Sequence, residues 1–194
     1  MDSRIGSMAS ERVDTLSPRP AVFLDRDGTL MDEVDYCRDP RDVRVVPGVA
    51  SFLEAMRDAG WLTILITNQS GIGRGKITIS EYHAVHAEFM RQIQNQLDAA
   101  FFCPDAPPAV SARRKPEPGM ILEAMQQYSI DRSRSWMIGD KVADVQCGKN
   151  AGVRTALVRT GYGASYDGPA PDVIAADVVE ALSMIRQLDQ QEPS

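Results

Sequence analysis

Short apolar runs alternate along this chain with longer stretches in which apolar residues recur every three or four positions. An uninterrupted apolar run of about four to eight residues is typical of a strand buried on both faces, and the three-to-four spacing is typical of an amphipathic helix. The pattern predicts five strands, at 21–24, 62–66, 100–102, 136–138 and 155–158. It predicts a helix after each strand, at 47–60, 80–97, 118–128, 142–150 and 178–188.

The regular alternation of strands and helices predicts the α/β class, with a doubly wound parallel sheet that carries helices on both faces. Residues 20–189 hold the whole pattern and are expected to form one domain. Residues 1–19 are polar and show no periodicity, so we expect a disordered or appended tail there. A short C-terminal tail is expected at 190–194.

Composition narrows the class of partner. The 194 residues include 21 basic and 27 acidic side chains, a net charge of −6. An acidic surface repels phosphate backbones, so nucleic acids and anionic membranes are not expected partners. No apolar run approaches the roughly 20 residues of a membrane span, and the start of the chain has no apolar signal region. The three scattered cysteines favour reduced thiols and a cytoplasmic location: Cys37, Cys103 and Cys147.

Polar side chains follow the predicted strands, at the edge where ligands bind to parallel sheets. Asp25 and Asp27 follow the first strand, Thr67 the second and Asp140 the fourth, while Lys115 precedes a helix. Carboxylates that converge there repel one another, and Mg²⁺ is the usual counter-ion for such an oxygen-only set. A threonine hydroxyl and a lysine ammonium would stabilise an oxyanion beside it. The pattern therefore predicts Mg²⁺-dependent phosphoryl transfer.

In this order, the motifs resemble those of the haloacid dehalogenase-like (HAD) phosphatases: Asp25-Arg-Asp-Gly-Thr29, Thr67, Lys115 and Gly139-Asp140 with Asp144. Within that superfamily, longer strings resemble the D-glycero-D-manno-heptose 1,7-bisphosphate phosphatases, and the histidinol-phosphate phosphatases share much of the pattern; these strings are 24–29, 67–75, 114–116 and 157–161. The resemblance covers nearly all of 20–189 and implies a Rossmann-like HAD core. The segments between the motifs are too short for an inserted cap domain, so a capless, open site is expected.

The resemblance implies a role for each motif residue. Asp25 would attack phosphorus and form an aspartyl-phosphate, and Asp27 would serve as general acid and then general base. The Asp25 side chain, the Asp27 backbone carbonyl and Asp140 would hold Mg²⁺. Thr67 and Lys115 would bind the transferring phosphoryl oxygens.

The resemblance also implies the surroundings of the substrate. Asp144 would orient the lysine or a metal-bound water from behind. The substrate would be a small sugar phosphate, such as a heptose 1,7-bisphosphate that loses its 7-phosphate. The residues expected around it are Arg26, Glu33, Val34, Asp35, Tyr36, Asn68, Gln69, Ser70, Arg114 and Lys141.

One loop departs from the family pattern. Many members carry a zinc loop of three cysteines and a histidine just before the Arg-Lys-Pro segment, but here Cys103 is the single cysteine in that region. A structural zinc needs four ligands, so we predict no zinc. Prolines are expected to stiffen the loop instead. A basic rim is expected beside the site for a second anionic group of the substrate, formed by Arg74, Lys76, Arg113 and Arg114.

Other functions fit the sequence less well. Histidinol phosphate is the main alternative substrate, and a polynucleotide 3′-phosphate is disfavoured by the acidic charge. A phospho-accepting receiver domain also combines acids, a threonine and a lysine around Mg²⁺, but the third predicted strand here ends without a clear acceptor. His83 and His86 are expected on a solvated helix face. The expected protein is a monomer whose partner is a small phosphorylated metabolite.

Overall fold

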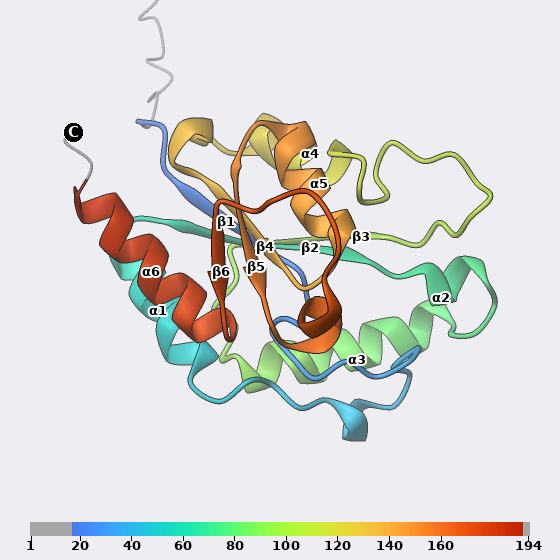
Figure 1. The fold of residues 1–194 in the computed structure, drawn as a ribbon. Helices are drawn as coiled ribbons and strands as arrows, with labels where there is room; N and C mark the ends of the chain where they lie inside the picture. Colours follow the sequence, from blue (N-terminus) through green and yellow to red (C-terminus); the bar gives the residue numbers. More distant parts are fainter. Residues whose placement is uncertain (1–16, 192–194) are drawn as a thin grey trace, which may run out of the picture.

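The computed structural model describes residues 17–191, and its centre is one six-stranded sheet (Figure 1). The strands are β1 (Ala21–Leu24), β2 (Leu62–Asn68), β3 (Ala99–Cys103), β4 (Trp136–Gly139), β5 (Arg154–Val158) and β6 (Val173–Ala175). Their order is β3-β2-β1-β4-β5-β6, and every neighbouring pair is parallel. Because β1 lies in the middle and the chain grows outward from it in both directions, this is the predicted doubly wound sheet.

Helices cover both faces of the sheet. The helices are α1 (Val49–Asp58), α2 (Ser70–Gly73), α3 (Ile79–Gln92), α4 (Gly119–Gln127), α5 (Val142–Ala151) and α6 (Val178–Gln191), with short 3₁₀ turns η1 (Pro40–Asp42), η2 (Arg132–Arg134) and η3 (Gly161–Ser165). Figure 1 shows α1, α3 and α6 on one face, with α4 and α5 on the other. The predicted α/β class is confirmed.

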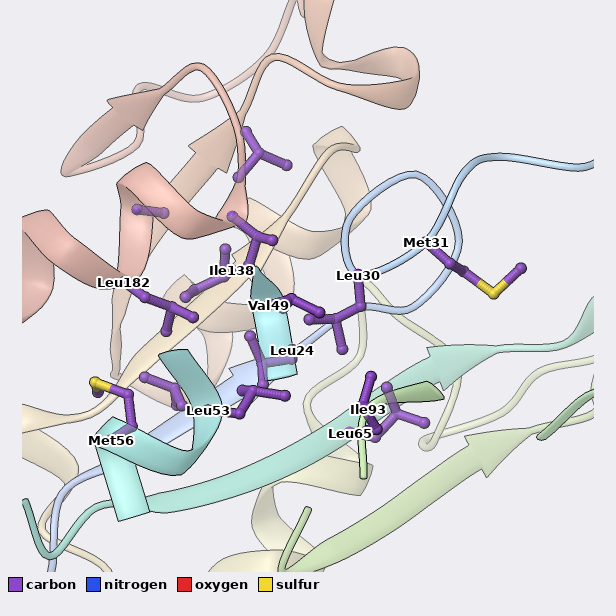
Figure 2. Packing of buried hydrophobic residues seen from close by; sticks show 14 of the residues in the cluster. Leu24, Leu30, Met31, Val49, Leu53, Met56, Leu65, Ile93, Ile138 and Leu182 are labelled. Atoms are coloured by element: carbon purple, nitrogen blue, oxygen red, sulfur yellow. The ribbon is translucent and has the colours of Figure 1, made fainter. Parts of the chain in front are cut away.

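The central strand β1 is completely buried, and its side chains alternate between two apolar cores. Val22 and Leu24 belong to the core under α1, α3 and α6, whereas Phe23 belongs to the core under α4 and α5. Figure 2 shows Leu24 beside Leu53 of α1 within the first core. Burial on both faces explains the uninterrupted apolar run, and it fixes the carboxyl end of β1, where the acidic motif begins.

The second predicted helix, at 80–97, is wrong at its C-terminal end. Helix α3 ends at Gln92 rather than near residue 97, because Gln94 and Asn95 turn the chain with φ of 54° and 56°. That turn brings Asp98 to β2, where its Oδ2 accepts a hydrogen bond of 2.8 Å from the Thr63 backbone N–H. Leu97 still packs against the first core, so its apolar spacing continues although the helix does not.

The structure contains ordered elements at the sheet edge and at both chain ends that the sequence did not predict. Strand β6 has only three residues, too few for a visible apolar pattern. At the start of the described chain, Arg19 pairs with Ile130, and α6 continues to Gln191. Ordered structure therefore reaches just beyond 20–189 at both ends. The remaining tail predictions, on 1–16 and 192–194, lie outside the described residues.

The two connections that lead into and out of β2 contain few elements. Between β1 and β2 the chain forms η1 and α1, and between β2 and β3 it forms α2 and α3. Neither connection contains a folded cap domain within 17–191. None of the helices described has the length and apolarity that crossing a bilayer requires.

Candidate active site

A buried lysine joins two carboxylates at the carboxyl ends of the central strands. Lys115 Nζ donates to Asp25 Oδ1 at 2.6 Å and to the Ile66 carbonyl at 2.8 Å, and it lies 2.6 Å from Asp144 Oδ1. An ammonium has three hydrogens, and these three contacts use all of them. Burial disfavours the Lys115 charge, but Asp144 and Asp25 outweigh it and raise the pKa of the lysine. Lys115 is therefore a fixed positive charge beside Asp25.

The backbone of Lys115 is fastened to strand β2 by one side chain. Asn68 Oδ1 accepts from the Lys115 N–H at 3.0 Å, and Asn68 Nδ2 donates to the Lys115 carbonyl at 3.0 Å. Both ends of the Asn68 side-chain amide thus bind the backbone of one residue, Lys115, although Asn68 also lines the pocket. Asn68, which the sequence resemblance places near the substrate, thus also positions Lys115.

Gln69 connects Asp27 with Thr67. Its Nε2 donates to Asp27 Oδ2 at 2.8 Å and to Thr67 Oγ1 at 2.9 Å, so both amide hydrogens are used. Gln69 is only 6% exposed, which keeps water from competing for these bonds. Because Thr67 accepts from Gln69, its own hydroxyl hydrogen is not used in that bond; the side chain is 1% exposed and does not itself line the pocket.

Arg26, expected near the substrate, is turned toward Asp27. It is 1% exposed, and its Nη2 lies 3.1 Å from Asp27 Oδ1 while its Nε contacts both carboxylate oxygens. The guanidinium carbon lies 5.6 Å from the centre of the Tyr82 ring, a cation–π contact. Burial opposes the charge, but the Asp27 carboxylate raises the pKa of Arg26. Arg26 thus braces Asp27 from inside the protein.

A second carboxylate lies beside Asp25. Ligand oxygens of Asp25, Asp140 and Asp144 lie within 4.8 Å of one another, and all three residues are buried. Asp140 Oδ2 accepts from the Tyr162 N–H at 2.8 Å, but Asp140 Oδ1 is buried and has no hydrogen-bond partner among the described residues. A buried carboxylate oxygen without a partner is costly unless a cation or donor meets it. The donor set is all oxygen, which fits Mg²⁺.

Burial also controls the titration of this cluster. It raises the pKa of Asp25 to about 7, with the Lys115 charge acting in the opposite direction. It raises the pKa of Asp140 to about 6, opposed by Lys141. A divalent cation between the two carboxylates favours their ionised forms and reverses both shifts.

Asp144 supports the site from the first turn of α5. Its Oδ2 accepts from the Lys141 N–H at 2.9 Å and so caps the helix, while Oδ1 contacts Lys115. The carboxylate lies directly on Gly139, where an added Cβ would come within 2.3 Å of it. Both of its oxygens thus have protein partners, as the predicted supporting role requires.

Two glycines that sequence analysis left without a role enclose Asp140. Gly28 and Gly161 both have positive φ, of 86° and 52°, and an added Cβ would lie 2.4 Å and 2.2 Å from Asp140 Oδ2. Thr160 Oγ1 donates to the Gly28 carbonyl at 2.6 Å and holds the two loops together. The string Arg159-Thr-Gly161 belongs to the motifs that carry the family resemblance, and it is the sequence feature that could have indicated a role for Gly161.

The site opens into a pocket of about 190 Å³. Of the residues expected around the substrate, Arg114 does not line it, because its Nη1 donates to the Asp105 carbonyl. Lys141 Nζ pairs with Glu33 Oε2 at 2.8 Å across the mouth and lies 4.7 Å from the Tyr162 ring centre. The expected residues that do line the pocket are Arg26, Glu33, Val34, Asp35, Tyr36, Asn68, Gln69, Ser70 and Lys141. Four further residues line the pocket although the sequence did not predict them there: Cys37, Gly71, Ile77 and Ala143.

Neither the family's zinc loop nor the two histidines add a metal cluster in the described chain. Cys103 Sγ lies 3.5 Å from Asp105 Oδ2 and 3.6 Å from Ser111 Oγ, which are neutral or acidic oxygen partners rather than further thiolates. His83 is exposed as expected, but His86 is half-buried against the Tyr82 ring. Burial lowers the pKa of His86 to about 4, so the expectation of a solvated face is wrong for this residue.

Comparisons with known proteins agree with this geometry. The HAD-hydrolase-like family matches residues 112–182. The D-glycero-D-manno-heptose-1,7-bisphosphate 7-phosphatase of Thermosynechococcus vestitus is 39% identical over 188 residues, which cover 87% of this chain and 96% of that protein. The D-glycero-beta-D-manno-heptose-1,7-bisphosphate 7-phosphatase of Haemophilus ducreyi is 36% identical over 180 residues, which cover 86% of this chain and 98% of that protein.

Solved structures show the same likeness. The crystal structure of D,D-heptose 1,7-bisphosphate phosphatase from B. bronchiseptica, complexed with magnesium and phosphate, matches with a TM-score of 0.80 and 29% identity, covering 87% of this chain and 99% of that one. A putative HAD-like phosphatase from Mesorhizobium loti matches with a TM-score of 0.75 and 32% identity, covering 95% and 92%. The chain belongs to the D-glycero-D-manno-heptose-1,7-bisphosphate 7-phosphatase family of HAD-like hydrolases.

Proposed function

We propose that this protein is a Mg²⁺-dependent phosphatase that removes the 7-phosphate from D-glycero-D-manno-heptose 1,7-bisphosphate. The observation that carries the chemistry is the buried cluster of Asp25, Lys115, Asp140 and Asp144, in which Asp140 Oδ1 has no hydrogen-bond partner within residues 17–191 and only Lys141 Nζ, at 3.9 Å, as an ion-pair neighbour. The substrate follows from relatives named for this activity that share 36–39% of their residues with the chain.

Asp25 is the proposed nucleophile. Its carboxylate attacks phosphorus and forms an aspartyl-phosphate, and the sugar hydroxyl leaves. Lys115 keeps the nucleophile oriented and offers positive charge to the phosphoryl oxygens, since its ammonium already contacts Asp25. Thr67 donates its free hydroxyl hydrogen to another phosphoryl oxygen. Water then cleaves the intermediate and regenerates Asp25.

Asp27 is the proposed general acid and base. In the first step it protonates the leaving sugar oxygen, and in the second it takes a proton from the attacking water. Gln69 and Arg26 hold its carboxylate from two sides, so the group enters the reaction in a defined orientation.

Mg²⁺ fits the oxygen cluster, and the residues proposed to hold it are the Asp25 and Asp140 side chains and the Asp27 backbone carbonyl. The bound cation neutralises negative charge on the phosphoryl group during transfer. Asp144 keeps Lys115 and the start of α5 in place beside it. No zinc is proposed, because Cys103 lacks three further ligands of zinc-binding type around it in the described chain.

We also propose that the domain at 20–189 acts as a cytoplasmic monomer on a small phosphorylated metabolite. The three cysteines are buried free thiols, as in a reducing compartment. Among the exposed large apolar side chains, Val142 and Tyr162 line one hollow, and the others lie on separate elements or loops, an arrangement that supports a monomer; the exposed side chains are Ile79, Val110, Leu122, Val142, Tyr162 and Ile174.

Phosphate release tests the proposal. The purified enzyme is assayed with both anomers of D-glycero-D-manno-heptose 1,7-bisphosphate and with histidinol phosphate, each with and without Mg²⁺. We expect turnover of a heptose bisphosphate that requires Mg²⁺, with much lower kcat/KM for histidinol phosphate. Equal, slow hydrolysis of all substrates would contradict the sugar assignment, and release of about one phosphate per chain would indicate a receiver.

A further inference from the structure

A second hollow, of about 690 Å³, lies next to the reaction pocket. It is lined by Tyr36, Gly73, Arg74, Lys76 and Ala106, Pro107, Pro108 and Ala109. Two cations and no acid line it among the described residues, although the whole chain has a net charge of −6. We call it the basic hollow. A concave surface of this charge favours an anionic ligand.

The two walls of the basic hollow are fixed to each other. The Gly73 N–H donates to the Pro104 carbonyl at 3.0 Å. An added Cβ at Gly73 would lie 2.7 Å from that oxygen and 3.0 Å from the Ala106 nitrogen, so the backbones touch. Figure 1 shows α2 and the loop after β3 extending on the same side of the molecule. Backbone contacts between the two segments therefore fix the shape of the hollow.

In the turn that carries Arg74 and Lys76, the backbone N–H groups are already hydrogen-bonded within the protein. The Arg74 N–H donates to Ser70, the Gly75 N–H to Ile72 and the Lys76 N–H to Gly71, all between 2.8 and 3.0 Å. This turn can therefore bind an anion in the hollow only through the Arg74 and Lys76 side chains. Neither side chain forms an ion pair within residues 17–191.

The predicted basic rim divides into two pairs. Arg113 Nε lies 3.2 Å from Glu123 Oε1, and Arg114 Nη1 donates to the Asp105 carbonyl. These two guanidinium groups are already engaged with protein oxygens. Arg74 and Lys76 remain as the cations of the rim that face an open hollow.

Tyr36 joins the basic hollow to the reaction pocket. It lines both, and it adopts a φ of 50°, which is unusual for a residue other than glycine. Its ring lies on Gly71, where an added Cβ would come within 2.6 Å of the Tyr36 Cδ1 atom. Strained backbone of this kind is often found where a ligand is positioned. A substrate that places one phosphate at Asp25 and extends past Tyr36 enters the basic hollow.

We propose that Arg74 and Lys76 bind the second phosphate of the bisphosphate substrate, the phosphate that stays on the leaving sugar. This inference rests on the proposed function. It makes the basic hollow the place where the enzyme distinguishes a bisphosphate from a monophosphate. Arg74 contributes a planar pair of donors, and Lys76 a point charge.

The test compares two substrates that share the reacting phosphate. The double variant Arg74→Gln and Lys76→Gln is assayed with heptose 1,7-bisphosphate and with heptose 7-phosphate. We expect kcat/KM for the bisphosphate to fall about 100-fold, or about tenfold for each charged contact. We expect kcat/KM for the monophosphate to stay unchanged. Equal losses on both substrates, or no loss on the bisphosphate, would overturn the inference.

A matched control separates local contact from net charge. Arg132 precedes β4 and Lys149 lies in the last turn of α5, both at the end of the sheet away from the site. The double variant Arg132→Gln and Lys149→Gln removes the same two charges, and we expect both substrates to be hydrolysed at wild-type rates. An equal loss in this control would assign the effect to long-range attraction and overturn the subsite.

Inhibition distinguishes the source of the anion. The product heptose 1-phosphate should inhibit the wild type. Its inhibition constant should be about 100-fold higher for the Arg74 and Lys76 double variant. Inhibition by inorganic phosphate should be the same in both. If inorganic phosphate alone loses potency, the hollow binds a free anion and the inference is wrong. A wild type that cannot hydrolyse the bisphosphate overturns the proposed function itself, whereas an active wild type with an unaffected variant overturns only this subsite.

Discussion

The reaction pocket and the basic hollow lie side by side but are built in opposite ways. At the centre of the pocket, the charged groups are buried and lie against one another: Lys115 is 4% exposed and contacts Asp25 and Asp144, and Asp140 is fully buried. In the hollow, Arg74 and Lys76 are exposed on a turn and face open space. Burial makes the first set rigid and strongly interacting, while exposure leaves the second set free to change without disturbing the fold. We therefore propose that the shared phosphatase chemistry and the choice of substrate depend on separate parts of the molecule.

Removal of the nucleophile is the most severe way to break the pocket. Asp25→Asn keeps the shape of the side chain but cannot form an aspartyl-phosphate, so kcat should fall by about 10⁴-fold or more. Thermal unfolding should show that the variant still folds, because a neutral group at this buried position avoids the cost that raises the pKa of Asp25. A variant with near wild-type kcat would refute the assignment.

The next largest effect is expected from a substitution that crowds Asp140. Gly161→Ala adds a Cβ 2.2 Å from Asp140 Oδ2 at a φ of 52°, whereas Gly60→Ala adds one at a φ of 86° with nothing within 4 Å. Both should lose about 1–2 kcal/mol of unfolding free energy from the left-handed backbone. Only Gly161→Ala should also need about tenfold or more Mg²⁺ for half-maximal activity. Equal Mg²⁺ requirements in the two variants would show that Asp140 tolerates the crowding.

Acidity should change how strongly Mg²⁺ stabilises the pocket. The pKa values of Asp25 and Asp140 are raised by burial, to about 7 and about 6, above the unfolded value of about 3.9. The metal-free folded state therefore holds extra protons, and these groups lower stability as pH rises through that window. Because Mg²⁺ binds the ionised forms, its stabilising effect should grow over the same range.

The measurement is the Tm with and without excess Mg²⁺ at about pH 5 and about pH 8. We expect the larger Mg²⁺-induced rise at the higher pH. The variant Asp140→Asn serves as the control and should lose most of the rise at both pH values. A rise that is independent of pH would contradict the link between the carboxylates and the cation.

The smallest effect is expected in the loop after β3. Cys103→Ser replaces a buried thiol that contacts Asp105 and Ser111, and it should cost about 1 kcal/mol or less while kcat stays unchanged. Elemental analysis of the wild type should find no stoichiometric zinc. One zinc per chain, or loss of the fold when a zinc chelator is added, would show that the loop is a metal site after all.

The sequence predicts most of the residues that line the pocket, but not the contacts that surround Asp140 and Asp27. Asp25, Thr67 and Asp140 each follow an apolar run, so parallel pairing was enough to bring them to one edge. The position of Gly161 over Asp140 depends on how the chain turns after β5, which no local pattern reveals. The direction of the Arg26 side chain, toward Asp27 rather than the substrate, likewise follows from the packing of α3 behind it.

The two hydrogen bonds between the Asn68 side-chain amide and the backbone of Lys115 have a consequence for protein engineering. They anchor Lys115 to β2 through contacts that involve none of the residues from Pro104 to Arg113. Loop grafts between Cys103 and Arg114 should thus be possible with the catalytic lysine left in register. An exchanged loop could then contact a different leaving group, while the catalytic residues keep their positions.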